Sequence, residues 1–169
     1  MMEDIENAYL ILARQFQRAI DNDDMIALRD TAALMDLQHL TFVEIDEDSG
    51  RKVSKPLTVY AAEHGSTDIM AFLIEEGCNL NARDSFGNTP LMIAVAEERM
   101  DMITFLMRQP DIQIDVQNYY GETLSSIAKM NNNIDIINYI KTWSPITDIN
   151  GQPMPEFIET TGGNGKLII

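Results

Sequence analysis

The feature that most constrains this 169-residue chain is a set of residues that recurs every 33 or 34 positions. Asp68, Asp101 and Asp135 each precede a pair of apolar residues. Two other sets keep the same intervals, namely small residues (Ala61, Ala94, Ala128) and ring–aliphatic pairs (Phe72-Leu73, Phe105-Leu106, Tyr139-Ile140). A fixed interval of this size predicts one structural unit that is stacked several times.

Residues 75–94 show what one unit contains. Gly77 suits a helix end, because glycine readily adopts positive φ. Thr89 is a natural N-cap, and Pro90 suits the first turn of the helix that follows it. The stretch therefore predicts a helix end, a tight turn through Asp84 and Gly87, and a new helix. The next unit repeats the turn, with Gly121-Glu122-Thr123 in place of Gly87-Asn88-Thr89.

A period of 33 residues with a turn and two helices is the ankyrin signature, and residues 51–143 resemble ankyrin repeats. The resemblance implies an all-α solenoid of about four helix–turn–helix units, the first of them degenerate. Met92 stands where the family usually has His. Lys55-Pro56-Leu57 and Glu122-Thr123-Leu124 only partly restore the Thr-Pro-Leu element, so we expect those two helix starts to be less well capped.

The flanking segments depart from the period. Apolar residues at helical spacing predict a helix over 3–20, and a second helix follows Asn22-Asp23-Asp24. Alternation over 41–54 predicts a short β-like finger, and its acidic turn at Asp46–Gly50 lacks the spacing of a calcium loop. The expected organisation is a repeat domain over 1–143, divided into an N-terminal capping unit (1–37), an insertion with the finger (38–55), repeats at 56–86, 87–120 and 121–143, and then an irregular tail at 144–169.

Composition narrows the functional classes. The chain is 45% hydrophobic, which is typical of a globular protein, and its net charge is −15. Such a charge disfavours nucleic-acid binding. The simplest interpretation is that acidity serves solubility, and attraction of a basic partner is the alternative. No apolar run is long enough to span a bilayer, and the acidic N-terminus lacks the basic region of a Sec signal. With a single cysteine, these features favour the cytoplasm, while delivery by another secretion route stays open.

The sequence gives no signal of catalysis. His39 and His64 are the only imidazoles, and Cys78 is expected to be a small buried residue far from His64. One cysteine and two histidines make a zinc site improbable. Gly165-Lys166 lacks the spacing of a phosphate-binding loop. We therefore expect no catalytic residue, metal, cofactor or small-molecule substrate, and a chain that is not an enzyme.

A repeat stack without chemistry acts through a surface. The ankyrin resemblance implies a partner-binding face made of the turn tips and the exposed side of the first helices. Phe86, Tyr119 and Tyr120 are its most distinctive residues, because aromatic side chains are enriched in binding hot spots. The carried-over residues are Ser85, Phe86, Asn88, Met92, Ala96 and Glu97 in one repeat, Tyr119, Tyr120, Glu122, Ser126, Met130 and Asn131 in the next, and Lys52, Val53, Lys55, Val59, Glu63 and His64 in the preceding one.

The resulting expectation is a non-catalytic protein–protein interaction module that acts as an adaptor or an inhibitor of a protein partner of basic or mixed charge. An alternative is a bacterial effector or a regulatory subunit of an enzyme, with its function in the tail or in the 38–55 insertion. A third is a scaffold that self-associates through the end of the stack or the tail. The apolar end of the tail, Leu167-Ile168-Ile169, suits packing on its own domain or docking in a partner's groove.

Overall fold

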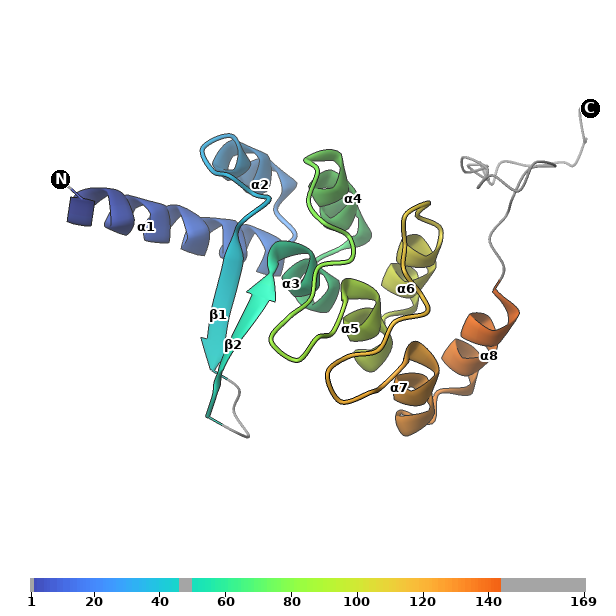
Figure 1. Cartoon of the computed structure of the whole chain (residues 1–169). Coiled ribbons are helices and arrows are strands. Elements are labelled where there is room, and N and C mark those ends of the chain that lie inside the picture. Colours follow the sequence, from blue (N-terminus) through green and yellow to red (C-terminus); the bar gives the residue numbers. More distant parts are fainter. Residues whose placement is uncertain (1, 46–49, 144–169) are drawn as a thin grey trace, which may run out of the picture.

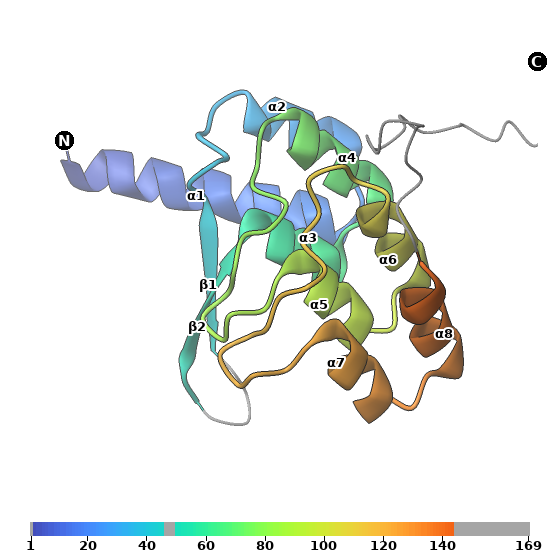
Figure 2. The ribbon, with the colours of Figure 1, turned by 45° about the vertical axis from the view of Figure 1, so that its right-hand side comes forward.

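The computed structural model describes residues 2–45 and 50–143, and these form a row of helix pairs (Figure 1). The first helices of the pairs, α3, α5 and α7, lie side by side in one layer, and α4, α6 and α8 form a second layer (Figures 1 and 2). The predicted tail and most of the acidic turn lie outside the described residues. The elements are α1 (Met2–Asp21), α2 (Met25–Ala32), β1 (Thr41–Ile45), β2 (Lys52–Pro56), α3 (Leu57–His64), α4 (Thr67–Glu75), α5 (Pro90–Ala96), α6 (Met100–Met107), α7 (Leu124–Met130) and α8 (Ile134–Thr142).

The predicted N-terminal helices and finger are confirmed. Strands β1 and β2 pair in antiparallel register, from Thr41 opposite Pro56 to Ile45 opposite Lys52. Tyr60 of α3 joins this region to the repeats, because its hydroxyl donates to Asp21 Oδ1 at 2.6 Å at the end of α1. Its ring also meets that of Phe42 edge-on at 4.8 Å. Burial and the Asp21 hydrogen bond raise the pKa of this phenol.

Lys55 attaches the finger to α3. Its ammonium group lies 2.7 Å from Glu44 on β1 and 2.5 Å from Glu63 on α3. Burial acts to lower the pKa of Lys55, but the hydrogen bonds to the two carboxylates outweigh it and the pKa is raised. The charged form is therefore the stable one, and the finger is fixed against the first repeat.

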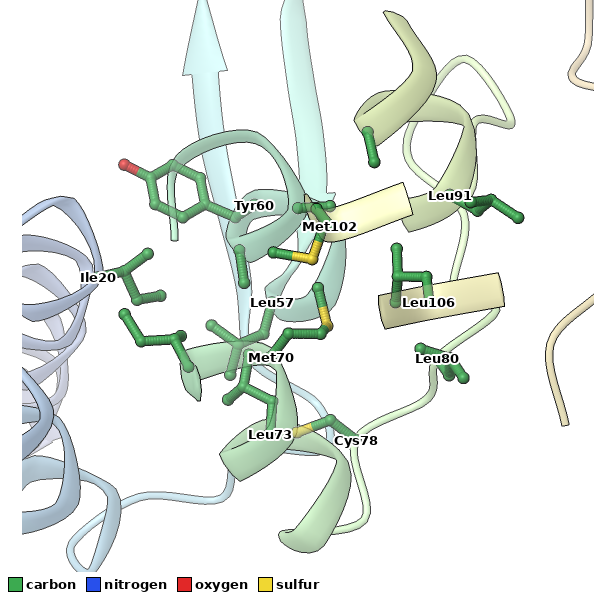
Figure 3. Packing of buried hydrophobic residues seen from close by; sticks show 14 of the residues in the cluster. Ile20, Leu57, Tyr60, Met70, Leu73, Cys78, Leu80, Leu91, Met102 and Leu106 are labelled. Atoms are coloured by element: carbon green, nitrogen blue, oxygen red, sulfur yellow. The ribbon is translucent and has the colours of Figure 1, made fainter. Parts of the chain in front are cut away.

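Small residues on the first helices let successive repeats approach closely. Ala61, Ala94 and Ala128 are fully buried. The space between the layers is filled by large apolar side chains, among them Met70 and Met102, which Figure 3 shows between neighbouring helices. At the end of the described repeats, Trp143 is half-buried against the core.

The helix ends and caps agree with the expectation from the sequence, except for the cap of α7. Gly77 adopts φ +79°, and its N–H and that of Cys78 bond back to Ile74 and Leu73, which closes α4 as a Schellman motif. Pro56 gives α3 no side-chain cap, as expected.

The expectation of a poor cap at α7 is wrong. Thr123 Oγ1 accepts the Ser126 N–H, and Ser126 Oγ accepts the Thr123 N–H at 2.7 Å. Serine thus takes the place that Glu or Gln holds in the usual capping box.

Ala94→Leu tests the repeat packing. The added carbons have no room between α3, α5 and α7, so we expect a loss of about 1–3 kcal/mol in the free energy of unfolding, measured by urea denaturation. Ala96→Leu on the same helix is the matched control, because Ala96 is exposed and its change should stay within about 0.5 kcal/mol. Equal stability of the two variants would contradict this packing.

Candidate partner-binding surface

The turn loops are joined to one another by backbone hydrogen bonds. The Ser85 N–H donates to the Ser54 carbonyl of β2 at 3.1 Å, and the Ser54 N–H donates to Ser85 Oγ at 2.8 Å. One repeat further, the Tyr119 N–H donates to the Phe86 carbonyl at 2.9 Å. The finger and the two turns therefore form one continuous ladder, which we call the turn ladder (residues 41–45, 52–56, 85–86 and 119).

A chain of side-chain hydrogen bonds runs behind the turn ladder. Asp84, only 5% exposed, accepts the N–H groups of Phe86 and Asn88 through one carboxylate oxygen, both at 2.8 Å. Asn118 holds the same place in the next repeat and accepts the N–H groups of Tyr120 and Glu122. The amide of Asn118 also donates to Asn88 Oδ1 at 2.9 Å, which connects the two turns. The predicted architectural role of Asp84 is confirmed.

Two further connections were not visible in the sequence. Arg83 Nη1 donates to the Gly87 carbonyl and to the Gln117 carbonyl of the next repeat, at 3.0 and 2.7 Å. The Asn81 side chain bonds to the backbone of Asp111 and Gln113. Residues 111–116 form no helix or strand, and the Asn81 side chain joins this segment to the preceding repeat.

The aromatic residues at the turn tips rest on this framework. Phe86 is half-buried, and its ring lies 6.2 Å from that of Tyr120. Tyr119 lies over Gly87, where a Cβ would come within 2.8 Å of the Tyr119 ring, and Gly87 also has φ +82°. Glycine is therefore required here both for the turn and for the tyrosine. Despite these contacts, Tyr119 and Tyr120 are 70% and 68% exposed.

Several predicted surface residues are accessible, and some are not. Met92 is fully buried, and so is Val59, which holds the equivalent position one repeat earlier. Val53 of the finger is also buried. The expectation that these three face a partner is wrong, because the packing of adjacent repeats encloses apolar side chains at these positions. The predicted residues that are exposed are Ser85, Ala96, Glu97, Tyr119, Tyr120, Met130, His64 and Lys52.

The remaining predicted polar residues are already engaged within the protein. Asn131 donates to the carbonyls of Val95 and Ala96. Glu122 accepts from Asn118, and Glu63 is paired with Lys55. The other members of this group are Asn88, bonded to Asp84 and Asn118, and Ser126, which caps α7. The accessible predicted residues therefore lie in two main groups, the turn tips with Ser85, Tyr119 and Tyr120, and the C-terminal ends of the first helices.

The residues considered as candidates for chemistry have separate surroundings in the structure. No group of three or more His, Cys, Asp and Glu with metal-binding geometry occurs within the described part of the chain. Cys78 is buried, with its sulfur 3.8 Å from the Leu37 carbonyl. The His64 imidazole lies instead against Glu63 and the Tyr60 ring. None of the helices within 2–45 and 50–143 has the length and hydrophobicity needed to cross a membrane.

A family model for ankyrin repeats (3 copies) matches residues 24–118 and 58–152, well over half of the chain. The chain belongs to the ankyrin-repeat family. Ankyrin repeats indicate a module for protein–protein interaction, and the chain is such a module.

The chain is also similar to several characterised proteins. It is 34% identical to human Rabankyrin-5 over 77 residues, which are 46% of this chain and 6% of that protein. It is 33% identical over 73 residues to I-Kappa-B like protein I1 of Microplitis demolitor bracovirus, or 43% of this chain and 44% of that one. I-Kappa-B like protein G2 of the same virus is 29% identical over 118 residues, covering 69% and 68%. The match to Rabankyrin-5 thus spans a small fraction of that protein.

Asp84→Ala tests the support beneath the turn tips. It leaves two buried N–H groups without their acceptor, so we expect a loss of about 1–3 kcal/mol in unfolding free energy by urea denaturation. Asp84→Asn is the matched control, because Asn118 accepts the equivalent bonds in the next repeat. It should be clearly more stable than the alanine variant, and equal losses would contradict a hydrogen-bonding role.

The Cys78 thiol should react slowly with a disulfide reagent such as DTNB at pH 8. Burial, assisted by the negative charges of Glu76 and Asp36, raises its pKa from 9.0 to about 11, so the reactive thiolate is about a hundredfold scarcer. Denaturation in urea should restore an ordinary rate. Fast labelling of the folded chain would contradict the burial of this side chain.

Proposed function

We propose that this chain is an adaptor or inhibitor that binds a protein partner through the aromatic turn tips, Phe86, Tyr119 and Tyr120, and the adjoining exposed side of α5 and α7. The observation that carries the proposal is the pair of adjacent tyrosines, each about two-thirds exposed on a turn whose backbone is fixed by the turn ladder. Tyrosine contributes a large contact area while losing little side-chain entropy. A turn that is already ordered further reduces the entropy lost on binding.

The charge of the chain supports a basic partner. At −15 the protein attracts positively charged surfaces and associates with them faster at low salt. An Arg or Lys side chain of the partner can also lie over an exposed tyrosine ring, an interaction of about 0.5–2 kcal/mol. Exposed Glu97 lies on the neighbouring part of the proposed face. The similarity to proteins named I-Kappa-B like supports the inhibitor form of the proposal.

The test begins with capture of a partner by the purified chain, identification by mass spectrometry and purification of that partner. Calorimetric titration then compares the native chain with Tyr119→Ala and Tyr120→Ala. We expect at least one variant to bind tenfold or more weakly, as hot-spot residues do. Leu34→Ala is the matched control, because Leu34 is 68% exposed but follows α2, on the far side from the turns. Affinity should also fall with added salt.

Two results would contradict the proposal. One is unchanged affinity in both tyrosine variants with their thermal stability preserved, which would place the partner elsewhere. The other is an equal loss in Leu34→Ala, which would indicate a general effect on folding. An activity assay of the captured partner then separates the two forms of the proposal, since an inhibitor abolishes that activity and an adaptor leaves it intact.

A further inference from the structure

The backbone of β1 has an open edge, and its register can be derived from contacts on the opposite strand. Both backbone groups of Ser54 on β2 are directed at Ser85, on the side away from β1. In an antiparallel pair, directly opposite residues have the same bonding type. Val43 lies opposite Ser54, so the N–H and C=O of Val43 also point away from their partner strand. They face outward from the sheet.

The outer side of β1 is where the turn ladder ends. Within residues 2–45 and 50–143, the sheet contains β1 and β2 alone. The turn loops lie beyond β2, and β1 lies on the far side of β2 from them in both views (Figures 1 and 2). The turns thus continue the ladder on the β2 side of the finger. On the β1 side, no strand of the described residues lies beside the outward backbone groups of Val43.

The side chains along this edge favour pairing with another strand. Phe42 is buried and Glu44 is bonded to Lys55, whereas Val43 and Ile45 are 62% and 67% exposed on the opposite face. Edge strands are usually protected by lysine or proline. In this finger, those residue types occur on β2, as Lys52, Lys55 and Pro56, and β1 has neither. The exposed edge of β1 therefore lacks the lysine and proline residues that are present on β2.

We propose that the outer edge of β1 binds an extended, basic polypeptide segment, which adds to the finger as a third strand. Backbone groups of Val43 would pair with the segment, and its alternate apolar side chains would lie beside Val43 and Ile45. The net charge of −15 favours a basic segment and opposes a second copy of this chain. This surface lies at the opposite end of the turn ladder from Tyr119 and does not depend on the turn-tip proposal.

The probe is a short synthetic peptide of alternating lysine and valine, with an alternating glutamate and valine peptide for comparison. Its affinity for the full chain is measured by fluorescence anisotropy, and its site by amide chemical shifts of the isotope-labelled chain. Val43→Pro removes the outward N–H without touching a β1–β2 bond, which is the position where a strand tolerates proline. Val43→Thr is the matched control, because it keeps the shape and the N–H.

We expect the lysine peptide to shift the amides of Val43 and Ile45, Val43→Pro to bind it at least tenfold more weakly, and Val43→Thr to bind within twofold of the native chain. The glutamate peptide should bind more weakly than the lysine peptide. If circular dichroism or thermal unfolding shows that Val43→Pro disturbs the finger, the Ile45→Lys variant is used in its place. The added lysine repels the basic peptide and leaves the backbone of β1 unchanged. The same tenfold loss is then expected.

Several outcomes would overturn the inference. One such outcome is that the native chain and the edge variant bind the lysine peptide with equal affinity. Peptide-induced shifts confined to Tyr119 and Tyr120 would assign the peptide to the turn tips. Dimerisation in sedimentation experiments that is lost in Val43→Pro, without peptide binding, would mean that the edge pairs with a second copy. Tyr119→Ala should leave peptide affinity unchanged, so a failed edge does not count against the turn-tip site.

Discussion

The C-terminal ends of α3 and α5 are completed by side chains of the repeat that follows each of them. The last carbonyls of an α-helix lack partners within the helix. The carbonyls of Ala62 and Gly65 at the end of α3 accept hydrogen bonds from Arg99 of the following repeat. One repeat on, the carbonyls of Val95 and Ala96 accept from Asn131. These two helix ends are therefore completed by the next repeat, and such bonds contribute to the nearest-neighbour stability of repeat proteins.

The same dependence shapes the candidate surface. Hydrogen bonds between successive turns hold the loops rigid, but they use the polar groups that lie nearest the turn tips, including those of Asn88 and Asn118. The hydroxyl groups of Tyr119 and Tyr120 and their rings are left at the surface. At the proposed binding site, a partner would therefore meet aromatic rings whose neighbouring Asn88, Asn118 and Asp84 side chains already have hydrogen-bond partners. Such a surface selects for packing and charge more than for hydrogen-bonding pattern.

The sequence predicted the repeat architecture well and the roles of individual surface residues less well, for a physical reason. The Gly77 helix end depends on local geometry, which residues close in the chain determine, whereas the repeated alanines could be found because they recur at a fixed interval. The burial of Met92 depends on packing between repeats, and the bond from Asn118 to Asn88 joins residues 30 apart. The cap at α7 was missed because the usual motif requires Glu or Gln, and Ser126 performs that role with a hydroxyl.

The two proposed binding surfaces both follow from the finite length of the turn ladder, as the position of the finger shows. The finger occupies the place of the turn that would come before the Ser85 turn in a regular stack. Ser54 makes the hydrogen bonds to Ser85 that such a turn would otherwise make. Within residues 2–45 and 50–143, the ladder ends at β1 on one side and at the turn of Tyr119 and Tyr120 on the other. Large apolar or aromatic side chains are exposed at both ends, Val43 and Ile45 at one and the two tyrosines at the other. Between these ends, Ser54, Ser85, Phe86 and Tyr119 are joined by hydrogen bonds, and both proposed surfaces therefore lie at the ends of the described ladder.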